Sequence, residues 1–230
     1  MSEVLGKMEK PEAAQFKDGR KLFFVPLIVT PLGEDETITG LVTQYWKEVA
    51  EQLKNLENKL SQIKRIYHEL LPGEESVNQL EMMKIGSFGI VQSLISDGAE
   101  ICAIEDDEIM REFLDWNLCL SMQLQSSKVF KKLYDFFQES VSQRNEHLAK
   151  RIDETLQGDE SAVLFMREGH RVQFPSDVQI FYVAPPALDA LQRALREQQE
   201  KAHKHEPDSS EQESSDAKPE QTDAAADAAS

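Results

Sequence analysis

Cysteine is scarce in this chain, and its two copies form no metal-binding or redox motif. Cys102 and Cys119 lie apart, each among apolar residues, and we interpret both as buried free thiols. The lack of a Cys-x-x-Cys pair excludes a zinc ribbon or a thioredoxin-like site. The Walker A, GxGxxG, HExxH, GxSxG and EF-hand patterns are absent as well. These absences argue against P-loop, dinucleotide-binding, zincin and serine-hydrolase functions.

Long apolar runs and excess positive charge are also missing. No apolar stretch approaches the roughly 20 residues that a membrane-spanning helix needs, and residues 1–21 lack the apolar centre of a signal peptide. We therefore expect a cytoplasmic protein that does not bind membranes. The 25 Lys and Arg residues are outnumbered by 42 Asp and Glu residues, for a formal net charge of −17. Without a basic stripe to displace counterions, nucleic-acid binding is not expected.

Charge and composition divide the chain into three parts. Residues 206–230 contain eight acids, one base and no Leu, Ile, Val, Met or aromatic residue. Such a segment cannot bury enough apolar surface to offset its ordering entropy, so we predict a disordered acidic tail. The polar residues 1–20 are predicted to be a flexible N-terminal segment. Residues 21–205 then form a single α/β domain.

Hydrophobic periodicity predicts the order β-α-β-α-β-α-α-β-β-α. The expected strands cover residues 22–29, 63–71, 100–104, 161–166 and 178–183, and the expected helices lie between and after them. Pro26 lacks a backbone donor, which predicts that the first strand is bulged or at a sheet edge. The apolar run at 162–166 is typical of a strand covered on both faces. The predicted fold is α/β, with a mainly parallel sheet of about five strands and helices on both faces.

One predicted helix is long and amphipathic. Its apolar residues recur at alternating spacings of four and three: Val42, Trp46, Val49, Leu53, Leu56, Leu60 and Ile63. The simpler interpretation is a helix that packs one stripe on the sheet. The alternative is a homodimer that forms through this 42–63 helix, because the spacing is also that of a short coiled coil.

Titratable side chains follow three of the predicted strands. His68 and Glu69 end the second strand, Glu105 follows the third, and Gly169-His170 follows the fourth. The carboxyl ends of parallel strands are where an open α/β sheet binds its ligands. Arg144 interrupts the apolar stripe of a predicted helix, where a charge must be paired, exposed or functional. A histidine, carboxylates and an arginine in one place suit acid–base or metal-assisted chemistry.

These motifs resemble the superfamily of erythromycin esterases, TraB and Tiki proteins and haem-binding ChaN proteins. In that superfamily a helix carries Arg with Asp or Asn, and a following strand ends in a Gly-His or Gly-x-x-His turn. This chain has Arg144-Asn145 and then Gly169-His170. Tyr67-His68-Glu69 and Glu105 resemble the ends of two earlier strands. The usual Gly-Glu pair before the first histidine is missing, and the match covers residues 61–184 in outline.

The resemblance implies that His68, Glu69, Glu105, Arg144 and His170 line one pocket, without selecting a reaction. Our first hypothesis is a hydrolase whose water is activated by His170, or by a divalent metal held by His68, Glu105 and His170. The second is a non-catalytic dimeric binding or scaffold protein. The third, by analogy with ChaN, is haem binding with Tyr67, His68 or His170 as axial ligand. The substrate, whether a small molecule or a peptide, is not predicted.

Overall fold

The computed structural model describes residues 18–28, 36–71 and 76–204. Its centre is a five-stranded sheet in which every pairing is parallel, with the strand order β3-β2-β4-β1-β5. The strands are β1 (Lys21–Pro26), β2 (Ile63–His68), β3 (Glu100–Ile101), β4 (Ser161–Met166) and β5 (Gln179–Tyr182). The predicted α/β class and parallel sheet are confirmed, and the order of strands and helices agrees except between β2 and β3.

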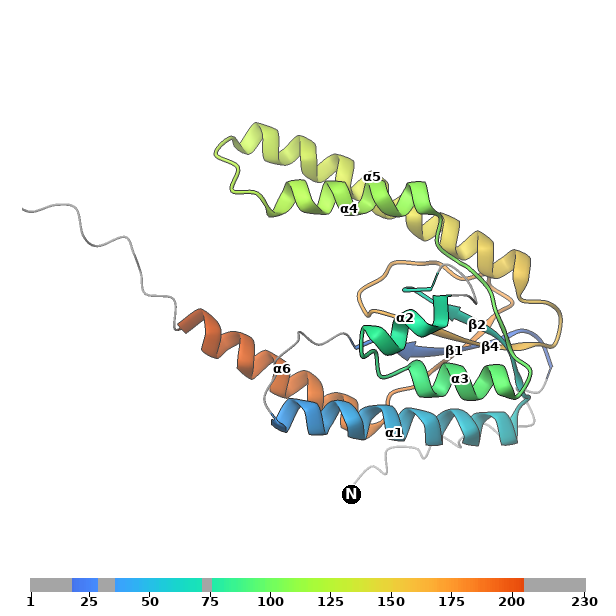
Figure 1. Cartoon of the computed structure of the whole chain (residues 1–230). Coiled ribbons are helices and arrows are strands. Elements are labelled where there is room, and N and C mark those ends of the chain that lie inside the picture. Colours follow the sequence, from blue (N-terminus) through green and yellow to red (C-terminus); the bar gives the residue numbers. More distant parts are fainter. Residues whose placement is uncertain (1–17, 29–35, 72–75, 205–230) are drawn as a thin grey trace, which may run out of the picture.

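Helices cover both faces of this sheet (Figure 1). The helices are α1 (Glu36–Lys59), α2 (Val77–Met82), α3 (Phe88–Ser96), α4 (Asp107–Ser121), α5 (Ser127–Thr155) and α6 (Pro186–Lys204). Side chains of α1, α2, α3 and α6 pack in one apolar cluster on the first face. The C-terminal part of α5 packs in a second cluster on the other face. α4 lies against α5 and extends with it beyond the sheet.

The two central strands are buried over their whole length. β1 and β4 pair from Lys21–Ser161 to Pro26–Met166, and every residue of both strands is buried. The side chains of alternate residues lie on opposite faces of the sheet. Val163 and Phe165 therefore belong to the first cluster, whereas Leu164 and Met166 belong to the second. An unbroken apolar run is what two covered faces require.

Pro26 does not mark an edge strand, and this prediction is corrected. β1 lies between β4 and β5. Pro26 is its last residue, and the pairing with β5 extends only from Lys21 to Phe24. The missing N–H therefore removes no bond from the ladder, because a proline at a strand end needs no donor on that side.

Between β2 and β3, where the predicted order has one helical region, the structure has two helices. Lys84 has φ 55°, in the left-handed region, and it separates α2 from α3. Gly86 follows it at a close approach, where an added Cβ would lie 2.0 Å from Trp46 Cδ1. The third strand is also shorter than predicted, since β3 spans only Glu100–Ile101. The predicted tail at 206–230 and most of the predicted N-terminal segment lie outside the described residues.

The stripe of the long helix packs on the sheet of its own chain. Trp46, Val49 and Leu53 are buried in the first apolar cluster, and Val42, Leu56 and Leu60 pack against it. Ile63, the last member of the predicted stripe, already belongs to β2. These side chains thus pack against other residues of the same chain. The alternative of a homodimer through residues 42–63 gains no support. Among the described helices, none has both the length and the apolar character of a membrane span.

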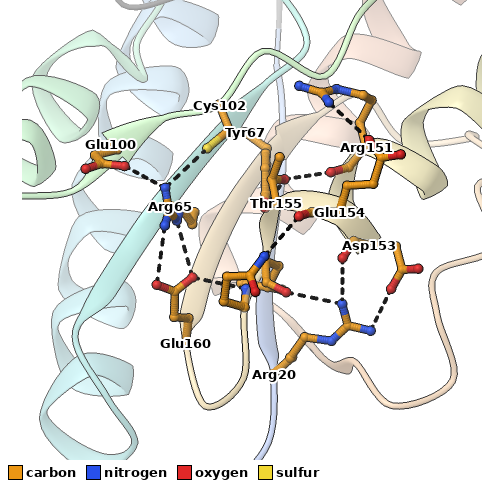
Figure 2. A network of polar contacts seen from close by, with 12 residues as sticks. Arg20, Arg65, Tyr67, Glu100, Cys102, Arg151, Asp153, Glu154, Thr155 and Glu160 are labelled. Carbon is orange, nitrogen blue, oxygen red and sulfur yellow. Dashed lines mark hydrogen bonds and ion pairs between the residues drawn. The ribbon is translucent and has the colours of Figure 1, made fainter.

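Ion pairs connect separate segments of the chain near the amino-terminal ends of the strands (Figure 2). Arg65 Nη1 lies 2.5 Å from Glu100 Oε2, and its Nε lies 3.2 Å from Glu160 Oε2. Arg20, just before β1, pairs with Asp153 at 2.8 Å and with Asp177 at 2.6 Å. Each arginine is thus matched by carboxylates from distant segments, and we interpret this network as structural.

Candidate active site

A cavity of about 450 Å³ lies at the carboxyl ends of β2 and β4, under the base of the α4–α5 hairpin. The sheet side contributes Glu69, Arg167 and His170, and the helices contribute Arg144, Phe113 and Phe137. Glu69 follows β2 and His170 follows β4, and these strands are neighbours in the sheet. This is the edge where parallel sheets bind ligands.

Glu69 is a buried carboxylate with cationic partners on two sides. The backbone N–H and the side-chain Nε–H of Arg167 both donate to it, each at 2.7 Å. Arg144 Nη2 approaches the same carboxylate at 3.5 Å. Burial alone would raise the pKa of Glu69, but the hydrogen bonds from Arg167 and the charges of Arg167 and Arg144 lower it below the ordinary value. Glu69 is therefore ionised at neutral pH.

Arg144 connects Glu69 to Glu105. Its Nε donates to both oxygens of Glu105, at 3.1 and 3.2 Å, and its Nη2 forms a further short bond to Oε1. The guanidinium carbon lies 5.1 Å from the centre of the Phe113 ring, in cation–π geometry. The charge on the apolar stripe of α5 is thus paired, and the side chain is buried at the cavity. Nη1 has no hydrogen-bond partner among the described residues.

His170 is half-buried beside the cavity, and the turn before it depends on Gly169. Gly169 has φ 85°, a conformation that glycine adopts without strain. The His170 ring packs between Phe24 and Phe174, with centroid distances of 5.0 and 5.7 Å. Its Nδ1 accepts a long hydrogen bond from Val172 N–H at 3.3 Å, which leaves Nε2 free.

The pKa of His170 is lowered. Burial is the main cause, the charge of Arg144 acts in the same direction, and the charge of Glu69 opposes both. The ring is therefore neutral at pH 7. A neutral half-buried imidazole with one free nitrogen can take or give a proton in the cavity.

His68 does not reach this cavity, and its predicted place in the pocket is corrected. Adjacent strand residues point to opposite faces, so Glu69 faces the cavity whereas His68 faces the α1–α3 side, where it contacts Phe165. Its Nε2 bonds to Ser87 Oγ at 2.9 Å, and its Nδ1 accepts from Leu70 N–H at 3.1 Å. Burial lowers its pKa to about 4. It is a neutral, fully bonded core residue.

The predicted metal and haem ligand sets do not fit this geometry. A metal held by His68, Glu105 and His170 needs all three on one side of the sheet, and His68 is on the other. Within the described part of the chain, no three His, Cys, Asp or Glu residues are placed to hold a metal. Of the predicted haem ligands, Tyr67 is buried and its hydroxyl bonds to Thr155 Oγ1 at 2.8 Å. Only His170 borders the cavity.

Several residues of the site were not predicted from the sequence. Arg167 holds Glu69, and Phe113 lies under Arg144. Asn145 and Arg171 also line the cavity. The position of Arg167 could have been recognised from the sequence, because it is the first charged residue after the buried run of β4. The role of Phe113 could not have been recognised, since an aromatic residue on a helix is most often part of the core.

The site therefore combines a neutral histidine with a buried Glu–Arg–Glu network beside a cavity. No protein-family model, no curated protein and no solved structure matches the chain.

Proposed function

We propose that the cavity is the active site of a hydrolase that cleaves an ester or amide with water, using His170 as general base without a metal. The observation that carries the proposal is the neutral His170, with Nε2 free, beside the Arg144 network. Perturbed titratable groups that gather at one cavity are the usual mark of a catalytic site. The resemblance to the erythromycin esterase superfamily is consistent with this chemistry.

His170 would move the proton. Its Nε2 takes a proton from water, the resulting hydroxide attacks the carbonyl carbon, and the imidazolium then gives the proton to the leaving group. For Nε2 to accept, the ring proton must be on Nδ1, and the contact with Val172 must open. That contact is a long and therefore weak hydrogen bond, at 3.3 Å.

Arg144 would stabilise the negative oxygen that forms on the carbonyl. Its Nη1 is free among the described residues, while Glu105 and Glu69 hold the remainder of the guanidinium in place. A donor fixed before the reaction needs no rearrangement in the transition state, which is why such groups contribute strongly to catalysis.

Hydrolysis of a panel of chromogenic esters and anilides tests the proposal. We expect turnover by the wild type, a loss of at least about 100-fold in His170→Ala, and unchanged turnover in His147→Ala. His147 is the matched control, because it lies on α5 outside the residues that line the cavity. Thermal unfolding of each variant separates loss of chemistry from loss of fold. Equal turnover in both variants would contradict the proposal.

A non-catalytic binding pocket is the second candidate. It is favoured by one observation: both carboxylates are already neutralised by arginines, so neither is a free base. With the proton on Nε2, His170 would donate to a ligand oxygen while Nδ1 keeps its bond to Val172. Wild-type protein that turns over no ester or anilide, but is stabilised against heat by small carboxylates, would select this function.

A further inference from the structure

The α4–α5 hairpin exposes apolar side chains that nothing in the described chain covers. In Figure 1, α4 and the first half of α5 extend beyond the sheet as a separate arm. No residue from Asp107 to Glu139 is buried. The hairpin patch consists of seven large, exposed side chains: Leu114, Leu118, Met122, Val129, Phe130, Tyr134 and Phe136.

The side chains of the hairpin patch are strongly exposed for apolar residues. Leu118 is 65 % exposed, Met122 is 59 % exposed, and the other five are about half-exposed. Large apolar side chains that gather on a surface are a mark of an interaction site. Leu114, Leu118 and Met122 recur every four residues, and Phe130 and Tyr134 do the same, so they form rows along the two helices. Rows of this kind are what helix bundles bury.

Charge is distributed unequally along the hairpin. The base of α4 carries exposed acids at Asp107, Glu108, Glu112 and Asp115, with one base at Arg111. The tip, where α5 begins, carries exposed Lys128, Lys131 and Lys132, and no acid occurs between Trp116 and Tyr134. The two ends of the hairpin therefore have opposite charge.

We infer that the hairpin patch docks a second copy of this chain, with the two hairpins antiparallel in a four-helix bundle. A two-fold axis across the hairpins places the lysine tip of each copy beside the acidic base of the other and repeats the contact twice. A parallel arrangement would instead bring the two lysine tips together. The charge pattern selects the antiparallel dimer.

The dimer would also affect the candidate active site, although the inference does not depend on the proposed function. Leu114 and Asn117 line the cavity from the middle of α4. In the antiparallel bundle the partner's hairpin lies along α4 and narrows the open side of the cavity.

Sedimentation velocity of the full chain, from about 1 to about 100 µM, tests the inference. We expect a reversible dimer for the wild type. The tip variant Lys128→Glu/Lys131→Glu/Lys132→Glu and the base variant Glu112→Lys/Asp115→Lys should each dimerise at least about tenfold more weakly. An equimolar mixture of the two should recover wild-type affinity, because each altered end then meets its opposite charge.

Apolar variants complete the test. Leu118→Asp with Phe130→Asp should abolish the dimer without unfolding the domain, since both side chains are exposed. Met82→Asp is the matched control, because Met82 is an exposed methionine on α2, outside the patch, and its variant should dimerise normally. A wild type that stays monomeric, a dimer that survives in the charge variants, or a mixture that does not recover would overturn the inference. So would a monomer that sediments with phosphatidylglycerol vesicles, which would assign the patch to a lipid surface.

Discussion

His68 and Glu69 are consecutive residues whose side chains lie on opposite faces of the sheet. Glu69 bonds to Arg167 at the cavity, whereas His68 bonds to Ser87 in the core on the α1–α3 side. At this strand end, Glu69 is thus part of the candidate site, whereas His68 is part of the core. The two residues should consequently respond to mutation and to pH in different ways.

The buried His68 should make folding stability fall in mild acid. Its pKa is about 4 in the folded protein and near 6.5 when unfolded. Between those values the unfolded chain binds more protons than the folded chain, so stability decreases as pH falls from about 6.5 to about 4. The full effect is about 3 kcal/mol.

Urea unfolding of the wild type and of His68→Leu at pH 7 and pH 4.5 measures this contribution. The variant loses two hydrogen bonds and should be less stable at pH 7. Its stability should nevertheless fall less than that of the wild type between the two pH values. An identical fall in both proteins would show that other groups cause the acid sensitivity.

Removal of Arg144 should destabilise the fold by leaving two carboxylates without their shared partner. Removing one partner of a buried ion pair costs about 3–5 kcal/mol of stability. We expect the lower end of this range, because Glu69 retains its ion pair with Arg167. We expect about 3 kcal/mol for Arg144→Leu in denaturant unfolding. The double variant Arg144→Leu/Glu105→Leu should recover part of this loss, because the uncompensated charge is removed. Arg111→Leu, an exposed arginine on α4, is the control and should change stability by less than about 0.5 kcal/mol.

The sheet and its covering helices were predictable from the sequence because strands and helices have different patterns of apolar residues. The run at 162–166 is unbroken, which fits a central strand of the sheet. The long helix has a regular apolar stripe, which fits a helix that covers one face of the sheet. The break between α2 and α3 was not predictable in the same way. It depends on Lys84 in the left-handed region and on Gly86 against Trp46, and the second of these contacts joins residues that are distant in sequence.

The site was predicted in part, for a similar reason. Strand ends and the interrupted stripe identified Glu69, Arg144 and His170, which line the cavity, and Glu105, which does not line it but bonds to Arg144. The error at His68 was avoidable, since strand alternation forbids two adjacent residues from sharing a face. Which of the two faces the cavity depends on the register of β2 with β4, and this register contains an irregularity between Ile63 and Arg65. Local sequence does not encode that shift.

Gly169 should be needed for its backbone conformation rather than for space. An added Cβ would meet nothing within 4 Å, but φ is 85°. Gly169→Ala should therefore cost about 1–2 kcal/mol of stability, or displace His170 from the cavity. Gly89→Ala is the matched control: its Cβ also meets nothing, φ is not positive, and it lies in α3. Alanine there should be neutral or stabilising by up to about 1 kcal/mol. Equal effects of the two changes in thermal unfolding would contradict this explanation.

The protonation of His170 should depend on Glu69 and Arg144 in opposite directions. NMR titration of the ring protons should give a pKa below 6.5 in the wild type, because burial disfavours the imidazolium. Glu69→Gln removes the charge that favours the imidazolium and should lower the pKa further, whereas Arg144→Leu should raise it. If His170 is the general base, hydrolysis should fall as the pH drops through this pKa, and in Glu69→Gln the fall should begin at lower pH. A titration that is unchanged in both variants would show that His170 lies outside the electrostatic reach of the network, and the site would then lack its coupled proton-transfer group.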